Sequence, residues 1–206
     1  MAKIFSIGYA GLSQEAFLAL LEKHQIQCIA DVRSSPYSKA FPNYNKENMP
    51  AWLKSQRIHY VYLGTELGPR SNDSSHYDNN GQVQFDRLSQ TPQFDKGIRR
   101  LENGAQKMNV AIMCAEKDPM TCHRSLLVAE YSKNSQLEFS HIMQDGSLET
   151  QQEMVDRAMK TYQITPDMFT PLEECRKSTH KKLCSRYAYS KPEGQRNNQG
   201  GFNRWE

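Results

Sequence analysis

The stretch Asn109-Val-Ala-Ile-Met-Cys-Ala-Glu-Lys-Asp-Pro-Met-Thr-Cys-His-Arg124 decides the fold of this chain. Its first six residues form the most apolar strand candidate in the sequence. Because residues 110–113 are all apolar rather than apolar at alternate positions, we expect this strand to be buried on both faces, as central strands of parallel sheets are. A polar loop follows Cys114, and we predict a helix over 122–134 directly after it.

Strand and helix patterns alternate on both sides of this stretch. Such alternation is typical of a mostly parallel sheet with helices on both faces. We therefore predict an α/β fold with a mostly parallel five-stranded sheet, a Rossmann-like three-layer arrangement, as a single domain over 1–165. The predicted strands are 3–7, 27–32, 59–63, 109–114 and 137–142, and the predicted helices are 14–24, 47–57, 92–103, 122–134 and 148–162. Residues 64–84 are predicted to form a long irregular loop, which in compact domains is usually functional or disordered.

Length and composition exclude several classes of protein. A chain of 206 residues fits one domain of ordinary size. No apolar run approaches the roughly 18–20 residues of a membrane span, and the N-terminus does not resemble a signal peptide. The five cysteines are odd in number and far apart, unlike those of a secreted disulfide scaffold. We therefore expect a reduced, cytoplasmic protein with no membrane partner, and its oligomeric state stays open.

Charge is distributed unevenly along the chain. The formal net charge is +3, yet residues 175–206 carry eight basic and two acidic side chains, while residues 1–174 have a net charge of −3. The segment 166–206 is therefore predicted to be a polar, basic and disordered tail, because it has too few apolar groups to offset the entropy of ordering. A nucleic acid or another polyanion is a candidate partner for it, and a solvated tail without a partner is the alternative.

Polar residues gather where the predicted strands end. Ligands of open parallel sheets bind at the carboxyl ends of strands, so we expect these residues to form one site. The candidate substrate-binding residues are Gly8, Tyr9, Asp31, Arg33, Glu66, Arg70, Cys114 and Arg124. Asp31 and Arg33 equally fit an internal salt bridge, and Cys114 fits a thiol buried in the sheet.

Cys122, His123 and Glu116 are the candidate catalytic residues. A thiol in the first turn of a helix, beside cations, is favoured as the thiolate. Cys122 would then be the nucleophile and His123 its base or hydrogen-bond partner. Arg33 and Arg124 would hold an anionic substrate such as a nucleotide, while Glu116 and Asp31 orient these two arginines. The alternative is that this segment only forms a turn and caps a helix.

Three kinds of function remain open from these residues. The first is an enzyme, with a thiol-dependent hydrolase or transferase as the class that the site fits. The second is a non-catalytic binding module, either for nucleotides or nucleic acids or, if the surface exposes an apolar patch, an adaptor for another protein. The third is a metal-binding protein that uses Cys114, Cys122 and His123. Their spacing matches no common zinc motif, so no cofactor or metal is expected.

Several motifs, in order, resemble those of the prokaryotic domain-of-unknown-function family 488 over about residues 3–145. The resemblance implies an α/β fold and a shared polar site, but no assigned reaction. At Tyr9 and Tyr62 the chain departs from the family pattern, which often has histidine there. The motifs are Ser6-Ile-Gly-Tyr9 with Phe17 and Leu20-Leu21, Ile29-Ala-Asp-Val-Arg-Ser34 with Pro36, Phe41-Pro-Asn-Tyr-Asn45, Tyr60 with Tyr62-Leu63 and Glu66-Leu-Gly68, and Cys114-Ala-Glu116 with Cys122-His-Arg-Ser-Leu126.

Overall fold

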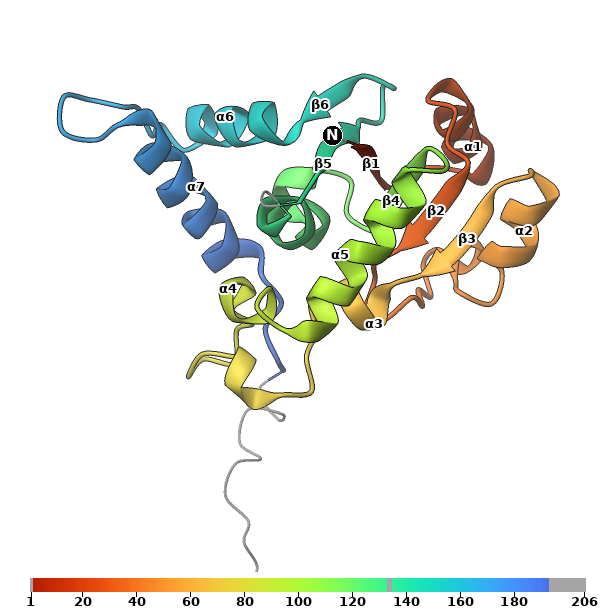
Figure 1. Cartoon of the computed structure of the whole chain (residues 1–206), viewed down its shortest axis with the longest axis horizontal. Helices are drawn as coiled ribbons and strands as arrows, with labels where there is room; N and C mark the ends of the chain where they lie inside the picture. The colour runs from red at the N-terminus through yellow and green to blue at the C-terminus, as the bar shows by residue number, and fades with distance from the viewer. Residues whose placement is uncertain (1, 133–134, 193–206) are drawn as a thin grey trace, which may run out of the picture.

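Strands β1 (Ala2–Gly8) and β4 (Val110–Cys114) lie side by side in the middle of a six-stranded sheet. The structure is a computed structural model that describes residues 2–132 and 135–192 (Figure 1). The strand order is β3-β2-β4-β1-β5-β6. The other strands are β2 (Cys28–Asp31), β3 (His59–Tyr62), β5 (Leu137–Ile142) and β6 (Leu148–Thr150). Only β6 is antiparallel to its neighbour among the paired strands. The predicted α/β fold with a mostly parallel sheet is therefore confirmed, and β6 is an addition at its edge.

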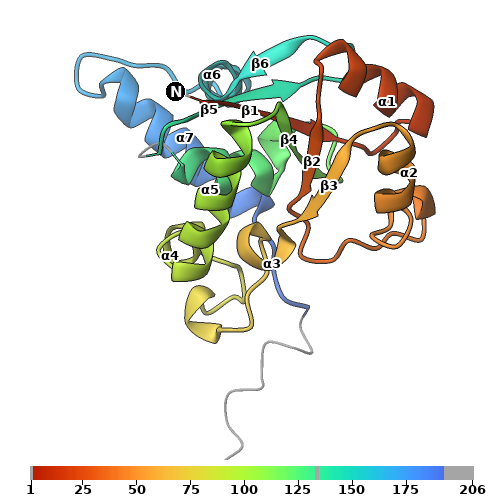
Figure 2. The same ribbon diagram turned by 45° about the vertical axis from the view of Figure 1, so that its right-hand side comes forward.

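Every residue of β4 is buried, as its unbroken apolar sequence predicts. Ile112 belongs to the hydrophobic core on one face of the sheet, and its neighbour Met113 belongs to the core on the other. Helices therefore cover both faces (Figure 2). One face is covered by α1 (Gln14–Lys23) and α2 (Met49–Ser55), and the other by α5 (Pro92–Ala105), α6 (Gln151–Thr161) and α7 (Leu172–Tyr187).

Capping side chains explain where the longer helices begin. The hydroxyl of Ser13 accepts a hydrogen bond from the Ala16 N–H, and Thr91 caps α5 in the same way just before Pro92. Thr150 and Glu153 form a reciprocal capping box at the start of α6. Because this box places the helix start at Gln151, the three residues before it are free to form β6 rather than the predicted first turn of helix.

Two irregular segments lie next to the carboxyl end of the sheet. The helix predicted over 122–134 is present as a helical run over 123–131, within which Arg124–Ala129 form the π-helix η4, and a 3₁₀ turn, η3 (Pro119–Thr121), comes before it. The predicted loop over 64–84 contains two short helices. A third short helix lies earlier in the chain than this loop, and a fourth directly follows it. These four are α3 (Gly64–Leu67), η2 (Ser74–His76), α4 (Phe85–Leu88) and η1 (Pro42–Tyr44).

Helix α7 was not predicted from the sequence, which favoured a disordered tail over 166–206. Its buried residues are Cys175, Thr179 and Leu183, at a spacing of four. This spacing places all three on one helix face, which lies against the domain. Three buried residues thus order a helix whose other positions are mostly polar. The remainder of the predicted tail, 193–206, lies outside the described residues.

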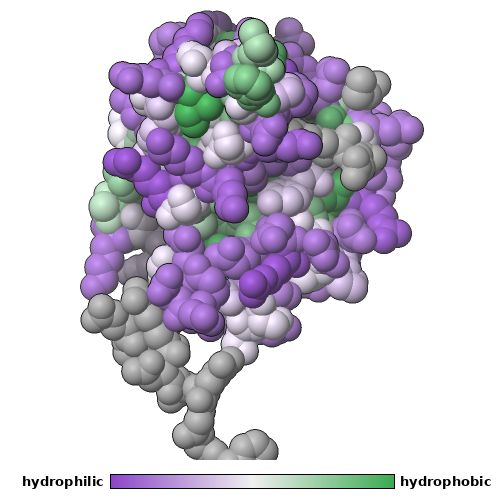
Figure 3. All heavy atoms as spheres, turned by 90° about the vertical axis from the view of Figure 1, so that its left-hand side faces the viewer, coloured by the Kyte–Doolittle hydropathy of each residue, from purple (hydrophilic) through white to green (hydrophobic). Residues whose placement is uncertain are grey.

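The surface on the α6–α7 side is mostly hydrophilic, with small separate apolar patches (Figure 3). The loop between these helices exposes Met168 and Phe169 almost completely, and Leu172 is also exposed. Within residues 2–132 and 135–192, no helix combines the length and the apolar composition needed to cross a membrane.

Candidate active site at the carboxyl end of the sheet

The ends of β1 and β4 bring the first site residues together. Gly8 lies opposite Cys114 in the register of these strands, and the Tyr9 N–H donates to the Cys114 carbonyl oxygen at 3.2 Å. A Cβ atom on Gly8 would lie 1.8 Å from the carbonyl oxygen of Glu116. Gly8 is therefore needed because the loop after β4 passes directly over it. It contributes space for the loop.

Two thiols, one carboxylate and one imidazole form the centre of the site. The Cys114 and Cys122 thiols donate to the same carboxylate oxygen of Glu116, Oε2, at 2.8 and 3.0 Å. His123 Nδ1 lies 3.5 Å from Cys114 Sγ and 3.9 Å from Cys122 Sγ. One donor atom from each of the four residues lies within 4.8 Å of the others. We call these four residues the thiol cluster.

Ionisation of the thiol cluster is asymmetric. Burial raises the pKa of the Cys122 thiol, but hydrogen bonding by Cys114 and the positive charge of Arg124 outweigh this effect and lower it well below its usual range. Burial and the neighbouring Cys122 instead raise the pKa of the Cys114 thiol. Burial, together with the negative charge of Cys122, also raises the pKa of Glu116. The cluster thus favours one thiolate, at Cys122, and keeps its remaining protons shared.

The imidazole of His123 is held from behind. Its Nε2 lies 2.9 Å from the carbonyl oxygen of Val32, so Nε2 carries a proton and donates it to this carbonyl. Nδ1 consequently faces the thiols. Cys122 has an extended backbone and His123 a helical one, and this change of conformation lets two adjacent residues face the same point.

Arg124 has a different position from the one predicted. Its side chain is completely buried, and its guanidinium donates to the Ser6 hydroxyl at 3.2 Å and to the carbonyl oxygens of Glu116 and Lys117 at 2.6 and 3.1 Å. These bonds hold the loop after β4 in place. The prediction that Arg124 contacts the substrate is therefore not supported by its position, because its donors face protein acceptors.

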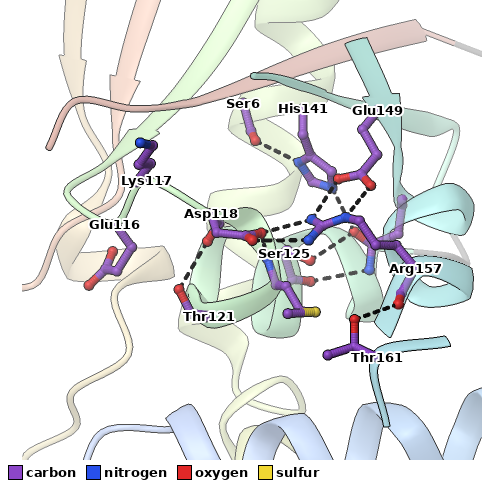
Figure 4. A network of polar contacts seen from close by, with 12 residues as sticks. Ser6, Glu116, Lys117, Asp118, Thr121, Ser125, His141, Glu149, Arg157 and Thr161 are labelled. Atoms are coloured by element: carbon purple, nitrogen blue, oxygen red, sulfur yellow. Dashed lines mark hydrogen bonds and ion pairs between the residues drawn. The ribbon is translucent and has the colours of Figure 1, made fainter. Parts of the chain in front are cut away.

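A second arginine holds the same loop from outside. Arg157 of α6 donates two hydrogen bonds to Asp118, at 2.8 and 3.0 Å, and two to Glu149 of β6, at 2.6 and 2.9 Å (Figure 4). Asp118 also accepts from the Met120 N–H and so caps η3. The loop that carries Glu116 is therefore held from two sides. Arg124 of η4 binds its carbonyl oxygens, and Arg157 of α6 binds its Asp118 side chain.

Sequence reasoning missed a buried polar chain that continues from Arg124. The Ser6 hydroxyl lies 2.6 Å from His141 Nδ1, and His141 Nε2 lies 2.9 Å from Gln151 Oε1 (Figure 4). Burial, with the nearby Arg124 charge, lowers the pKa of His141 to about 4, so this imidazole is neutral at pH 7. A histidine and a serine on neighbouring strands are the only sequence signal for this pair.

Asp31 and Arg33 form the internal salt bridge that was one of the two predicted alternatives. Both are buried, and Arg33 Nη2 lies 2.6 Å from Asp31 Oδ2. Tyr60 donates to the same carboxylate at 2.8 Å. Arg33 also donates to the Tyr9 hydroxyl at 2.9 Å and to the Tyr44 carbonyl oxygen at 2.8 Å. Asp31 thus neutralises Arg33 and orients it toward Tyr9.

A cavity of about 230 Å³ opens beside the thiol cluster. Three members of the cluster, Cys114, Glu116 and His123, line it, whereas Cys122 lies behind them with 1% of its surface exposed. The cavity also has two arginines in its wall, Arg33 and the exposed Arg70. Its other lining residues are Tyr9, Ser34, Ser35, Tyr37, Ser38, Pro69 and Ala115.

The structure does not bring Glu66 into this cavity. Its carboxylate forms an ion pair with Arg100, and it lines a separate cavity of about 700 Å³ on the other side of Arg70. Glu66 and Arg70 thus share that larger cavity, and only Arg70 reaches the thiol cluster's cavity. Glu66 follows the edge strand β3, which is the strand end farthest from β1.

Comparison with known proteins identifies the family. A family model described as domain of unknown function DUF488 matches residues 13–131, which is more than half of the chain. The chain belongs to the DUF488 family. In this DUF488 chain the matched segment contains the entire thiol cluster and both cavity arginines, whereas β1, β5, β6, α6 and α7 lie outside it. Searches of curated proteins and of solved structures found no match.

Proposed function

We propose that this DUF488 protein is an enzyme that binds a small anionic substrate beside the thiol cluster and acts on it as a hydrolase or transferase. The observation that carries the proposal is that a single cavity is lined by Arg33 and Arg70 and by Cys114, Glu116 and His123. Cationic donors and ionisable reactive groups in one recess are the combination that an enzyme for an anionic substrate needs.

Arg70 is the principal anion-binding group in this proposal. Its side chain is exposed and stacks over Tyr189, 4.5 Å from the ring centre, and among the described residues no carboxylate forms an ion pair with it. Arg33 is already neutralised by Asp31 and its contacts within the described residues leave one Nη1 hydrogen for a ligand. A phosphate or carboxylate group held by these two residues would lie next to Glu116 and His123.

The size of the cavity limits the substrate. Its volume of about 230 Å³ is below the roughly 300–1,000 Å³ of pockets that enclose drug-sized ligands. The cavity therefore suits a phosphorylated or carboxylated fragment, with any larger part of the molecule outside. Serine and tyrosine hydroxyls in its wall, from Ser34, Ser35, Ser38 and Tyr9, supply neutral donors around the anion.

Reactivity is assigned to the thiol cluster as a unit. A thiolate at Cys122 lies behind Glu116 and His123, which are the groups that face the cavity. Glu116 Oε2 lies 2.8 and 3.0 Å from the two sulfurs, so it is placed to move a proton between the cluster and a bound substrate. A nucleophile must be reached by the substrate. Cys114 lines the cavity and Cys122 does not, so a bound substrate would reach Cys114 more directly than the predicted nucleophile Cys122.

The test combines binding with turnover. Binding of inorganic phosphate and of adenosine monophosphate is measured by isothermal titration calorimetry, and turnover is followed with nitrophenyl phosphate and nitrophenyl acetate. Loss of one charge-assisted hydrogen bond costs about 1.5–3 kcal/mol, so Arg70→Ala should weaken anion binding roughly tenfold or more. The matched control Arg99→Ala, an exposed arginine on α5, should leave it unchanged.

Glu116→Gln separates an enzyme from a binding module. It should leave anion affinity within a few-fold and reduce turnover by a factor of about 10² or more, because it removes the proton acceptor. Equal turnover in Glu116→Gln and wild type would exclude the assigned chemistry. Anion binding that depends on Arg70, with no turnover of either ester, would favour the non-catalytic binding module.

A further inference from the structure

The geometry points to a zinc ion, bound by Cys114, Glu116, Cys122 and His123, as part of this protein. These side chains supply two sulfurs, one carboxylate oxygen and one imidazole nitrogen, all within 4.8 Å of one another. The inference rests on the same thiol cluster as the proposed function, but it does not depend on the anion. Within residues 2–132 and 135–192, these four form the one group of three or more such donors.

The distances between the donors fit a tetrahedral ion. Zinc lies about 2.3 Å from thiolate sulfur and about 2.0–2.2 Å from nitrogen or oxygen, which places tetrahedral ligands roughly 3.3–3.8 Å apart. The His123 Nδ1 atom lies 3.5 and 3.9 Å from the two sulfurs, and Glu116 Oε2 lies 2.8 and 3.0 Å from them. A shift of less than about 1 Å in the Glu116 side chain would bring Oε2 to tetrahedral separations from both sulfurs.

The histidine is presented as a ligand. Metal-bound histidines usually donate their second ring N–H to a carbonyl or carboxylate, which fixes the tautomer and the ring orientation. His123 makes this contact through Nε2, 2.9 Å from the carbonyl oxygen of Val32, and its Nδ1 faces the sulfurs. The hydrogen-bond partner that a metal-bound histidine needs is therefore present. It is the carbonyl oxygen of Val32, directly after β2.

Buried charge provides an independent argument. Two thiolates and a carboxylate carry three negative charges, so the cluster with a bound divalent cation has a net charge of −1. Arg124 is completely buried, its side chain donates to neutral oxygens, and its backbone N–H points at Cys122 Sγ from 3.5 Å. Among the described residues no carboxylate forms an ion pair with its guanidinium. The remaining negative charge of a zinc-loaded cluster would be the counter-ion that this buried cation needs.

The ligand types select the metal. Two thiolates and an imidazole suit zinc and other borderline or soft ions, whereas magnesium and calcium prefer oxygen ligands throughout. Glu116 lines the cavity and is the hardest of the four ligands. It is therefore the ligand that a water molecule or a substrate anion would replace, and catalytic zinc sites keep such an exchangeable position.

The test measures metal directly. The full chain is purified without chelators, and its zinc content is determined by plasma mass spectrometry. The protein is then stripped, its thiols are kept reduced, and Co²⁺ is added as a spectroscopic substitute. We expect about one zinc per chain and the intense visible bands of tetrahedral, thiolate-bound Co²⁺. Cys114→Ser or Cys122→Ser should lose most of the bound zinc and reduce the thiolate-to-cobalt charge-transfer band.

A matched cysteine variant controls for general thiol binding. Cys184 also lies beside a histidine, with its sulfur 3.4 Å from His180 Nε2, but it belongs to no group of three donors within the described residues. Cys184→Ser should therefore bind zinc and cobalt like the wild type. Because a cysteine variant can fail to fold, Glu116→Gln is the second test. It should keep the fold and weaken zinc binding, because it removes the anionic oxygen ligand.

The inference is overturned if the reduced wild-type protein contains no zinc and gives no tetrahedral Co²⁺ spectrum. The two proposals fail separately. Phosphate binding that depends on Arg70 in a protein without zinc would refute the metal centre alone, whereas zinc binding without anion binding or turnover would refute the proposed enzyme alone.

Discussion

Arg124 Nη1 donates a hydrogen bond of 2.6 Å to the carbonyl oxygen of Glu116, eight residues before it in the chain. This bond closes the loop that follows β4 around a completely buried cation. The loop in turn holds the Glu116 carboxylate against both thiols. A single arginine thus links the start of the π-helix, the end of the sheet and the reactive groups, and its role is to position them.

Replacement of this guanidinium should destabilise the protein strongly. Arg124→Met keeps much of the side-chain length but leaves the partly buried carbonyl oxygens of Glu116 and Lys117 without their donor. Each unsatisfied buried group costs about 1–3 kcal/mol, so the free energy of unfolding should fall by roughly 3 kcal/mol. Urea denaturation followed by circular dichroism measures this. Arg99→Met, at an exposed position, should change it by less than about 0.5 kcal/mol, and equal effects of the two variants would contradict the assignment.

Gly8→Ala should disrupt the site through its backbone. The added Cβ would lie 1.8 Å from the Glu116 carbonyl oxygen, so the loop after β4 must move. Overpacking of this kind costs about 1–3 kcal/mol, and the displaced Glu116 should also weaken any activity or metal binding of the thiol cluster.

Gly104→Ala is the matched control. Gly104 lies in α5, where an added Cβ would be 3.4 Å from the nearest atom of Val110. Because alanine is favoured over glycine in a helix by up to about 1 kcal/mol, this variant should be as stable as the wild type or more stable. Thermal melting of both variants decides the matter, and a stable Gly8→Ala with intact site chemistry would exclude the close-approach argument.

Acid should destabilise the fold through His141. Burial and the Arg124 charge lower the pKa of His141 to about 4, while an unfolded histidine titrates near 6.5. Between these values the unfolded chain binds more protons, so stability is lost as the pH falls from about 6.5 to about 4. The loss from this residue amounts to about 3 kcal/mol by the linkage relation.

His141→Gln should flatten that pH dependence. Unfolding free energies measured by urea denaturation at several pH values should fall less between pH 7 and pH 4 in the variant than in the wild type. His59→Gln, at an exposed position on the edge strand β3, should keep the wild-type pH profile. An unchanged profile in His141→Gln would show that other groups cause the acid sensitivity.

The basic side of α7 gives a prediction about a polyanionic partner. Four exposed basic residues recur along this helix, which makes it the described part of the predicted nucleic-acid-binding tail. They are Lys177, Lys181, Lys182 and Arg186. Changing all four to glutamine should weaken retention of double-stranded DNA at low salt and reduce the salt dependence of binding by up to about 3–4 units of log–log slope.

A charge-matched variant distinguishes this helix from general electrostatics. Lys54, Arg57, Lys96 and Arg99 are exposed on other elements, and their change to glutamine lowers the net charge by the same amount. The α7 variant should lose DNA retention and the matched variant should keep it. Equal losses would indicate non-specific attraction, and no retention by the wild type would remove the polyanion as a partner.

The order of strands and helices could be predicted because their signals are local. The apolar run 110–113 identified the central strand, and Ser13 and Thr91 with Pro92 marked two helix starts. The carboxyl-end rule for parallel sheets then placed Gly8, Cys114 and the Cys122–His123 pair near one another, and they lie near one another in the structure. Helix α7 escaped prediction because only three of its sixteen positions are buried, so its sequence resembles a solvated segment.

The sequence by itself determined the α/β fold, the family and the strand ends at which the site lies, because hydrophobic periodicity and motif order are properties of neighbouring residues. Only the tertiary structure decided what each polar residue does there. Arg124 binds backbone carbonyl oxygens, Arg33 is neutralised by Asp31, and Glu66 pairs with Arg100 outside the cavity. Which partner a side chain meets depends on the direction in which it points and on backbone carbonyl groups, which every residue has. The sequence therefore cannot distinguish a buried arginine that positions a loop from one that contacts a substrate.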